Sequence, residues 1–257
     1  MFKKSQFQIK TPAEFNLMRK AGRVVALCLE EIREQIKPGM STKDLDLIAE
    51  NIMKKEGAIP SFLGYHGYPA VICVSVNEEV VHGIPKENKI IEDGDLVSVD
   101  CGAIIEGWHG DAAISICVGN AKVEHKELCN ITKEAMFKGI SAAKTGNHVG
   151  DIGYAIETFV KSHRDLSIGI LEDYVGHGIG TQMHMPPSIP NYGSAGTGPK
   201  LEVGMAIAIE PMLVLGTNKV HVLEDEWTVV SSENSFASHW ENTIAITENG
   251  PEILTKL

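Results

Sequence analysis

Apolar residues recur at helical spacing in two pairs of neighbouring segments. The first segment begins at Thr11-Pro12-Ala13-Glu14, where a threonine cap, a proline and an acid three residues after the cap are typical of a helix N-terminus, and it ends at Lys37-Pro38-Gly39. The second runs from Ser41 to Gly57. The pattern returns over Glu124–Thr145 and from Asp151 to about Ser162, so the sequence predicts two pairs of helices.

Shorter apolar runs predict strands after each pair of helices. These runs are Ala70–Val76, Leu96–Ile104, Asp111–Val118, Ala206–Leu215, Trp227–Val230 and Trp240–Thr247. Two helices followed by strands, twice over, predict an α+β fold in which helices cover one face of a common antiparallel sheet. The other face of that sheet can hold a site where the two halves meet.

The two halves also match weakly in sequence at an offset of 107 residues. In this alignment Lys37, Gly39, Asp44, Leu45 and Glu50 meet Lys144, Gly146, Asp151, Ile152 and Glu157. We therefore predict one domain, residues 1–257, built from pseudo-repeat halves of about 11–118 and 124–250.

The stretch Asp95–Val118 is predicted to form a hairpin that carries two aspartates. If it closes around Ile105–Glu106, Asp100 and Asp111 are direct cross-strand neighbours with Cβ atoms roughly 4.5–5.5 Å apart. Two carboxylates about 5 Å apart repel by roughly 3 kcal/mol at an effective dielectric near 20. A buried pair needs a shared proton or a cation, whereas a pair that faces water needs neither.

Three further polar residues lie in apolar or glycine-rich surroundings: Glu210 in the run Ala206–Leu215, Glu241 at the start of the final strand, and His177 between glycines. Taken singly, each has an alternative as a solvated or exposed side chain. Taken together with the aspartates, they provide four carboxylates and one imidazole from separate segments. Such a set suits Mn, Fe, Co or Zn in a two-metal site better than a structural zinc.

Composition bounds the partners and the compartment. A formal charge of −11 argues against nucleic-acid binding as the main function. The five cysteines are scattered without a CxxC, which excludes a zinc finger, gives no disulfide framework and fits a reducing cytosol. The N-terminal stretch MFKKSQFQIK has no apolar core, so no signal peptide is predicted, and no run is long enough to cross a membrane.

Motifs for other chemistries fail in their context. Gly176–Gly180 is a GxGxG that no helix follows, and Gly193–Lys200 lacks the P-loop pattern and precedes a strand. Neither GxSxG nor HExxH occurs. Nucleotide binding, serine hydrolysis and HExxH zinc chemistry are therefore not predicted.

The ordered segments NEEVVHGIP, SVDCG, HGDAAI, GHGIG, IEPM and WENTIAIT resemble the type I methionine aminopeptidases in their short bacterial form, from about Thr11 to Leu254. The resemblance implies the pita-bread fold, in which two pseudo-symmetric halves share a curved antiparallel sheet with helices on its outer face. It implies removal of the N-terminal methionine from nascent polypeptides by two-metal-assisted peptide hydrolysis, with a preference for a small second residue.

The resemblance also implies roles for individual residues. The ligands of two divalent ions (Co, Mn, Fe or Zn) would be Asp100, Asp111, His177, Glu210 and Glu241. Catalysis would fall to His82, His184 and Glu210. A flexible methionine side chain needs aromatic walls, and the substrate-binding set is Phe62, Tyr65, Tyr68, Cys73, His82, Met183, His184 and Trp227.

The sequence departs from the common family pattern near this pocket. Phe62 stands where cysteine is frequent, Met183 where phenylalanine is usual, and Met185-Pro186-Pro187 where many relatives have acidic residues. We predict that Phe62 and Met183 lie close together at the mouth of the pocket and compensate each other in volume.

Two other functions compete with this interpretation: a metal-dependent dipeptidase of the prolidase type, and a non-catalytic pita-bread binding protein. The family resemblance implies the N-termini of nascent chains as partners, at the ribosome. We expect a cytoplasmic monomer without a nucleic-acid or membrane site.

Overall fold

The computed structural model of the chain describes residues 7–257; the first six residues, which belong to the N-terminal stretch and to the expected domain, lie outside the described residues. The helices are α1 (Pro12–Gln35), α2 (Thr42–Glu56), α3 (Val123–Ala142) and α4 (Val149–Ser162), with a short 3₁₀ turn η1 (Tyr65–Gly67). The strands are β1 (Ile59–Pro60), β2 (Cys73–Val76), β3 (Glu79–Val81), β4 (Leu96–Ile105), β5 (Trp108–Cys117), β6 (Ile168–Ile170), β7 (Gly176–Gly178), β8 (Met185–Ile189), β9 (Ala206–Ile209), β10 (Met212–Leu215), β11 (Val220–Val222), β12 (Val229–Ser231), β13 (Ala237–His239), β14 (Asn242–Thr247) and β15 (Gly250–Ile253).

The helices begin where their capping residues predict. Thr11 Oγ1 accepts a hydrogen bond from the backbone N–H of Glu14, whose carboxylate accepts from the backbone N–H of Thr11 at 2.6 Å. Ser41 and Asp44 form the same capping box at α2, which ends at Gly57 with φ of 69°. All four predicted helices are confirmed, with ends displaced by up to three residues. No helix within residues 7–257 is long and apolar enough to cross a membrane.

The turn between the helices is built in the same way in both halves. Gly39 and Gly146 have φ of 93° and 91°. Each donates its backbone N–H to a carbonyl at 2.9 Å, from Gly39 to Ile91 and from Gly146 to Leu201. The sequence repeat at an offset of 107 therefore coincides with a repeated structural unit.

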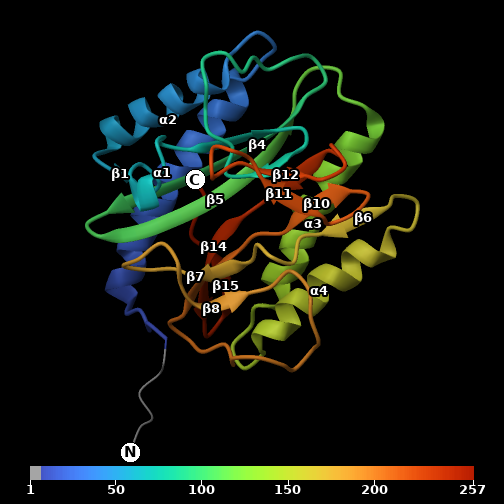
Figure 1. The fold of residues 1–257 in the computed structure, drawn as a ribbon. Coiled ribbons are helices and arrows are strands. Elements are labelled where there is room, and N and C mark those ends of the chain that lie inside the picture. The colour runs from blue at the N-terminus through green and yellow to red at the C-terminus, as the bar shows by residue number, and fades with distance from the viewer. Residues whose placement is uncertain (1–6) are drawn as a thin grey trace, which may run out of the picture.

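The strands gather in the middle of the molecule, with α1 packed against β4 and β5, α2 against α1, and the α3–α4 pair beside strands of the second half (Figure 1). All strand pairs among the described residues are antiparallel. The pairing falls into four groups: β4 with β1, β2 and β5; β13-β10-β6; β11-β12-β3; and β15-β14-β9-β7-β8. The common sheet that the pattern predicts is thus divided by breaks in its hydrogen bonding.

One such break changes the prediction for Glu210. The apolar run Ala206–Leu215 is not one strand, because β9 ends at Ile209 and β10 begins at Met212 in a different group. Pro211 lacks an N–H and cannot continue a ladder. Four other strands are shorter or displaced: Ala70–Val76 becomes Cys73–Val76, Asp111–Val118 becomes Trp108–Cys117, Trp227–Val230 becomes Val229–Ser231, and Trp240–Thr247 becomes Asn242–Thr247.

A close approach between glycines fixes β5 on α1. A Cβ atom at Gly110 would lie 2.7 Å from the backbone nitrogen of Gly22, and one at Gly22 would lie 2.3 Å from the carbonyl oxygen of Leu254. Glycine alone permits this contact. It holds the backbone of β5 rigidly at the residue that precedes Asp111.

Candidate active site

The β4–β5 hairpin places two aspartates on one face. Its turn is Glu106-Gly107, with φ of 50° and 82°, which suits a two-residue hairpin turn. Asp111 therefore pairs with Gly102, and Asp100 with Ala113. The prediction that the aspartates are direct cross-strand neighbours is wrong, because the turn closes one residue later and moves the register by two. The alternation of side chains still keeps both on the same face, as diagonal neighbours.

Both glutamates lie in connections between strands. Glu210 lies between β9 and β10, where its carbonyl accepts a hydrogen bond from Asn191 Nδ2 at 3.1 Å. Glu241 lies between β13 and β14, and its backbone N–H donates to the carbonyl of Ala113 at 2.9 Å. These backbone contacts fix the position of each glutamate between two strands, outside the regular hydrogen-bonded ladder.

The glycines around His177 serve strand packing. A Cβ at Gly176 or Gly178 would come within 2.4 Å or 2.3 Å of a backbone oxygen of a neighbouring segment. His177 Nδ1 lies 3.0 Å from the Gly178 carbonyl and donates to it, which leaves Nε2 to face Glu210 Oε1 at 3.5 Å. Such an orientation is typical of a histidine whose other nitrogen is a metal ligand.

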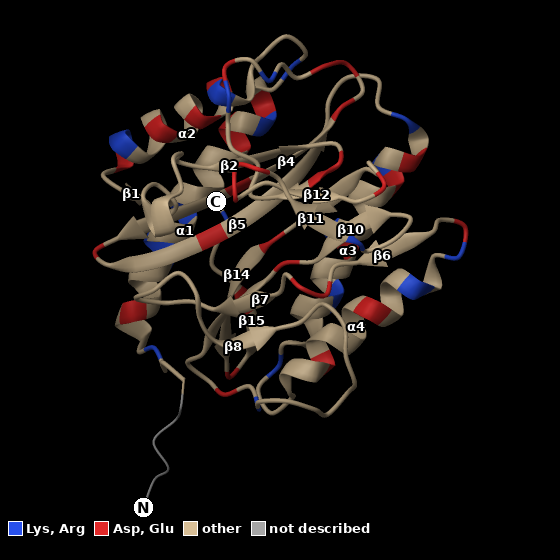
Figure 2. Cartoon of the chain, in the orientation of Figure 1, with Lys and Arg blue, Asp and Glu red and all other residues tan. Residues whose placement is uncertain are grey.

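Four carboxylates gather here without a basic side chain to neutralise them. None of the strands β1–β15 contains Lys or Arg. Figure 2 shows these residues on the helices and outer loops, whereas an acidic position lies on β5 in the middle. Burial raises the pKa of Asp100 to about 7 and that of Glu210 to about 8. It also raises the pKa values of Asp111 and Glu241 well above their ordinary range, and the neighbouring carboxylates add to the effect.

The donor set fits divalent metal ions. Ligand atoms of Asp111, His177 and Glu241 lie within 4.8 Å of one another, as do those of Glu210, His239 and Glu241. Glu241 belongs to both groups, as a bridging ligand does. One oxygen each of Asp100, Asp111 and Glu241 has no hydrogen-bond partner within residues 7–257. Buried unpaired oxygens are costly unless a proton or a cation binds them.

His239 is a residue of this site that the sequence analysis did not predict. It ends β13, is 2% exposed, and its Nε2 lies 3.6 Å from Glu210 Oε2. Within the described part of the chain this nitrogen has no hydrogen-bond partner. Its spacing of two residues from Glu241, in the strand-like sequence Ala237–Glu241, is the signal that could have identified it.

The histidines of the site are neutral. Burial lowers the pKa of His82 to about 4 and that of His177 to about 3, and it lowers the pKa of His184. His184 lies against His177, with ring centroids 4.3 Å apart, and its Nδ1 is hydrogen-bonded to the Tyr65 hydroxyl at 2.9 Å. A neutral imidazole held in this way can present a single N–H or lone pair to a substrate.

A cavity of about 170 Å³ adjoins the carboxylates. Every residue predicted for the site lines it: Phe62, Tyr65, Tyr68, Cys73, His82, Asp100, Asp111, His177, Met183, His184, Glu210, Trp227 and Glu241. The structure adds Val81, Tyr174, Val175, Met212 and His239. Phe62, Cys73 and Met183 belong to one buried apolar cluster, so one side of the cavity is apolar and the other carries the carboxylates.

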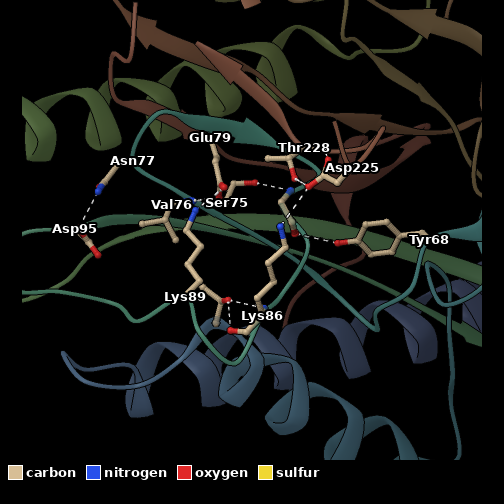
Figure 3. Close-up of polar contacts among 12 residues, drawn as sticks. Tyr68, Ser75, Val76, Asn77, Glu79, Lys86, Lys89, Asp95, Asp225 and Thr228 are labelled. Atoms are coloured by element: carbon tan, nitrogen blue, oxygen red, sulfur yellow. Dashed lines mark hydrogen bonds and ion pairs between the residues drawn. The ribbon is translucent and has the colours of Figure 1, made fainter. Parts of the chain in front are cut away.

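Polar contacts fix the aromatic wall of this cavity (Figure 3). The Tyr68 hydroxyl donates to the Gly83 carbonyl at 3.0 Å. Asp225 accepts a hydrogen bond from the backbone N–H of Trp227 at 3.1 Å and lies 3.5 Å from Lys86 Nζ. The Tyr68 and Trp227 rings then meet edge to face, with centroids 5.1 Å apart. The pocket is therefore formed before a substrate enters it.

Comparison with known proteins identifies close relatives. The model of metallopeptidase family M24 matches residues 16–248. The methionine aminopeptidase of Clostridium acetobutylicum is 49% identical over 247 residues, which cover 96% of this chain and 98% of that protein. Methionine aminopeptidase 1 of Bacillus subtilis is 49% identical over 248 residues, with the same coverage.

Solved structures give the same result. A methionine aminopeptidase from Thermotoga maritima superposes with a TM-score of 0.95 at 46% identity, covering 98% of this chain and 100% of that one. A prolidase from Pyrococcus furiosus superposes with a TM-score of 0.76 at 26% identity, covering 97% of this chain and 66% of that one.

Proposed function

The chain belongs to metallopeptidase family M24 and, within it, to the methionine aminopeptidases, and we propose that the residues of its cavity perform this activity in the roles given below. It is a metal-dependent peptidase that removes the N-terminal methionine from polypeptides. Its four helices and antiparallel strands form the pita-bread fold that the sequence resemblance implies.

One observation carries the proposal: four carboxylates and His177 line a cavity that has an apolar side, and no lysine or arginine of residues 7–257 lines it with them. Asp100, Asp111, His177, Glu210 and Glu241 would hold two divalent ions there. Ions so held supply Lewis acidity that polarises the scissile carbonyl and activates water. Oxygen donors with one or two imidazoles suit Co, Mn, Fe or Zn.

The chain's own residues handle the protons. Glu210, whose carboxyl has a pKa raised to about 8 by burial, is the group suited to hold a proton and pass it to the leaving amine. His184 donates a hydrogen bond to the oxygen on which negative charge develops, and Tyr65 orients its ring from the other nitrogen. His82, stacked edge-on against Trp227, contacts the peptide beyond the scissile bond.

The apolar side of the cavity selects methionine. A thioether is flexible and makes favourable contacts with aromatic edges, which Phe62, Tyr68 and Trp227 provide. A volume of about 170 Å³ accommodates one such side chain and little more. A preference for a small second residue is part of the proposal, since His82 and His184 line the same bounded cavity.

The natural substrates in this proposal are the N-termini of nascent chains at the ribosome, and the enzyme acts as a cytoplasmic monomer. The whole of residues 1–257 acts as one domain, because the two pseudo-repeat halves contribute ligands to the same site.

The experiment that tests the activity compares two peptides. The metal-loaded enzyme is expected to release methionine from Met-Ala-Ser and to leave Ala-Pro intact. The prolidase similarity makes dipeptidase activity the second candidate, and preferential turnover of Ala-Pro would establish it in place of the first. Absence of turnover on both peptides, with two ions bound, would support a non-catalytic binding protein.

A further inference from the structure

Two of the five cysteines lie side by side at the surface, away from the cavity. Cys117 is the last residue of β5, and Cys129 lies in α3. The Cys129 thiol reaches the β5 backbone, where it lies 3.3 Å from the carbonyl oxygen of Ser115. Ser115 and Cys117 are two residues apart on that strand, and the Cys117 thiol lies close enough to interact with that of Cys129.

Cys117 and Cys129 both line a hollow of about 350 Å³. Cys117 is half-buried and Cys129 is 8% exposed, so a small solute in the hollow reaches them. Arg33, Lys126 and Lys133 also line it. Three cationic side chains around a thiol stabilise its thiolate form.

A buried donor without a partner points to the same place. Trp240 lines the hollow and is 8% exposed, and its Nε1–H has no hydrogen-bond acceptor among residues 7–257. It faces Cys129, whose thiolate would be an acceptor for it. Lys133 Nζ lies 5.0 Å from the centre of the Trp240 ring and adds positive charge. Consistent with these contacts, the pKa of Cys129 is lowered to about 7, with the Cys117 thiol as the largest cause.

We propose that Cys117 and Cys129 form a peroxide-sensitive dithiol, with Cys129 as the attacking sulfur and Cys117 as the resolving one. The Cys129 thiolate attacks one oxygen of hydrogen peroxide: an S–O bond forms, the O–O bond breaks, and the departing hydroxide takes a proton and becomes water. The Cys117 sulfur then attacks the sulfenic acid, its own proton leaving to solvent. The S–S bond forms, the S–O bond breaks, and the second hydroxide becomes water with that proton.

The sulfur atoms are oxidised together by two electrons, and one peroxide is reduced to two waters.

The chain contains a matched internal control. Cys28 in α1 and Cys101 in β4 also have interacting thiols, but both are 0% exposed. The hydrogen bond with Cys28, together with burial, raises the pKa of Cys101 well above its usual range. Neither of them lines the substrate cavity or the hollow beside Trp240. Both pairs therefore have neighbouring thiols, but only the Cys117–Cys129 pair is accessible from a hollow lined by cationic side chains.

The test treats the full-length metal-loaded enzyme with one equivalent of hydrogen peroxide at pH 7 and counts thiols after denaturation. Free thiols are expected to fall from five to three, with one disulfide that peptide mapping places between Cys117 and Cys129. Cys129 is expected to react faster than Cys28 or Cys101, because both of those are 0% exposed and Cys129 lines a hollow beside cationic side chains. In Cys117→Ser, a cyclic diketone should trap the sulfenic acid on Cys129.

Three results would overturn the proposal. One is a count of free thiols that stays at five although the hydrogen peroxide has been consumed. Another is a disulfide between Cys28 and Cys101 that forms as fast. The third is retention of the sulfenic acid on Cys129 in the wild-type protein, which would show that Cys117 does not resolve it. The wild-type measurement stands without any variant, so a variant that fails to fold does not weaken the test.

Discussion

His239 Nε2 lies 3.6 Å from Glu210 Oε2, with no other partner in residues 7–257. The strand that carries His239 is held by two serine hydroxyls, Ser98 and Ser115, which accept hydrogen bonds from its backbone N–H at 3.3 Å and 3.0 Å. The imidazole is therefore positioned before any ligand binds. Burial lowers the pKa of His239, so it is neutral and can donate one N–H or offer one lone pair to the site.

The first prediction concerns this contact. His239→Ala is expected to weaken divalent-metal binding by about 10–100-fold, the usual effect of losing a group that orients a ligand. Titration calorimetry of the metal-free variant measures the change. His239→Gln, which keeps a donor at similar reach, should retain most of the affinity. If His239→Ala bound the metal with the same affinity as wild type, Glu210 would not need His239 to orient it.

The second prediction concerns the aspartates of the hairpin. Asp100→Asn and Asp111→Asn are each expected to abolish turnover of Met-Ala-Ser and the metal-dependent rise in melting temperature. The metal-free variants should be at least as stable as wild type, because each replaces a carboxyl whose ionised form is disfavoured by burial. Thermal melts with and without metal give both quantities.

Asp165→Asn is the matched control for these variants, since Asp165 is an exposed aspartate remote from the cavity. It should change neither activity nor the rise in melting temperature. If Asp111→Asn still bound two ions with wild-type affinity, the assignment of Asp111 as a metal ligand would be wrong.

The third prediction follows from the raised carboxyl pKa values. Asp100, with a pKa of about 7, and Glu210, with a pKa of about 8, hold protons in the folded state that the unfolded state has released. Stability from such groups is present below the unfolded pKa and is lost as the pH rises through the folded one. The metal-free protein should therefore melt at lower temperature at pH 8 than at pH 6.5.

The range from pH 6.5 to pH 8 is chosen because the histidines contribute little to the change in stability there. His82 and His177, with pKa values lowered to about 4 and about 3, stabilise the protein as the pH rises, and most of that gain is complete near their ordinary value of 6.5. Melting curves in a chelator at both pH values measure the change, and Glu210→Gln should show a smaller one. A melting temperature that rises from pH 6.5 to pH 8 in both proteins would contradict the prediction.

Much of this fold and site could be predicted from local sequence. The capping residues Thr11 and Ser41 marked helix starts because a cap is a local interaction, and the apolar face of each helix follows from its period. The strand breaks could not be predicted from periodicity. Met212 and Ile209 belong to different strand groups because Pro211 ends one ladder, and a run of apolar residues looks the same on either side of the break.

The register of the hairpin and the role of His239 needed three-dimensional information. Gly107 and Glu106 form a turn with positive φ at both positions, and the sequence EG is a weaker signal for it than NG or DG. His239 reaches Glu210 only because β13 and β10 pair. Such a long-range contact leaves no periodic signal in either segment.

The last prediction concerns Phe62 and Met183, which belong to one apolar cluster and both line the cavity. Phe62 is packed over Gly102, where an added Cβ would lie 2.9 Å from its ring, so the ring cannot retreat in that direction. Phe62→Cys is expected to weaken methionine binding by roughly 1–3 kcal/mol, the scale of a badly filled apolar contact. Met183→Phe alone should crowd the same space.

The double variant should recover much of the loss if the two side chains compensate in volume, which appears as a coupling energy in a double-mutant cycle. Specificity constants for Met-Ala-Ser across the four proteins measure it. Phe159→Cys, in α4 and away from the cavity, combined with Met183→Phe provides the additive control. If the effects of Phe62→Cys and Met183→Phe add as closely as those of the control pair, the two side chains fill separate spaces. The unusual residue at each position would then need its own explanation.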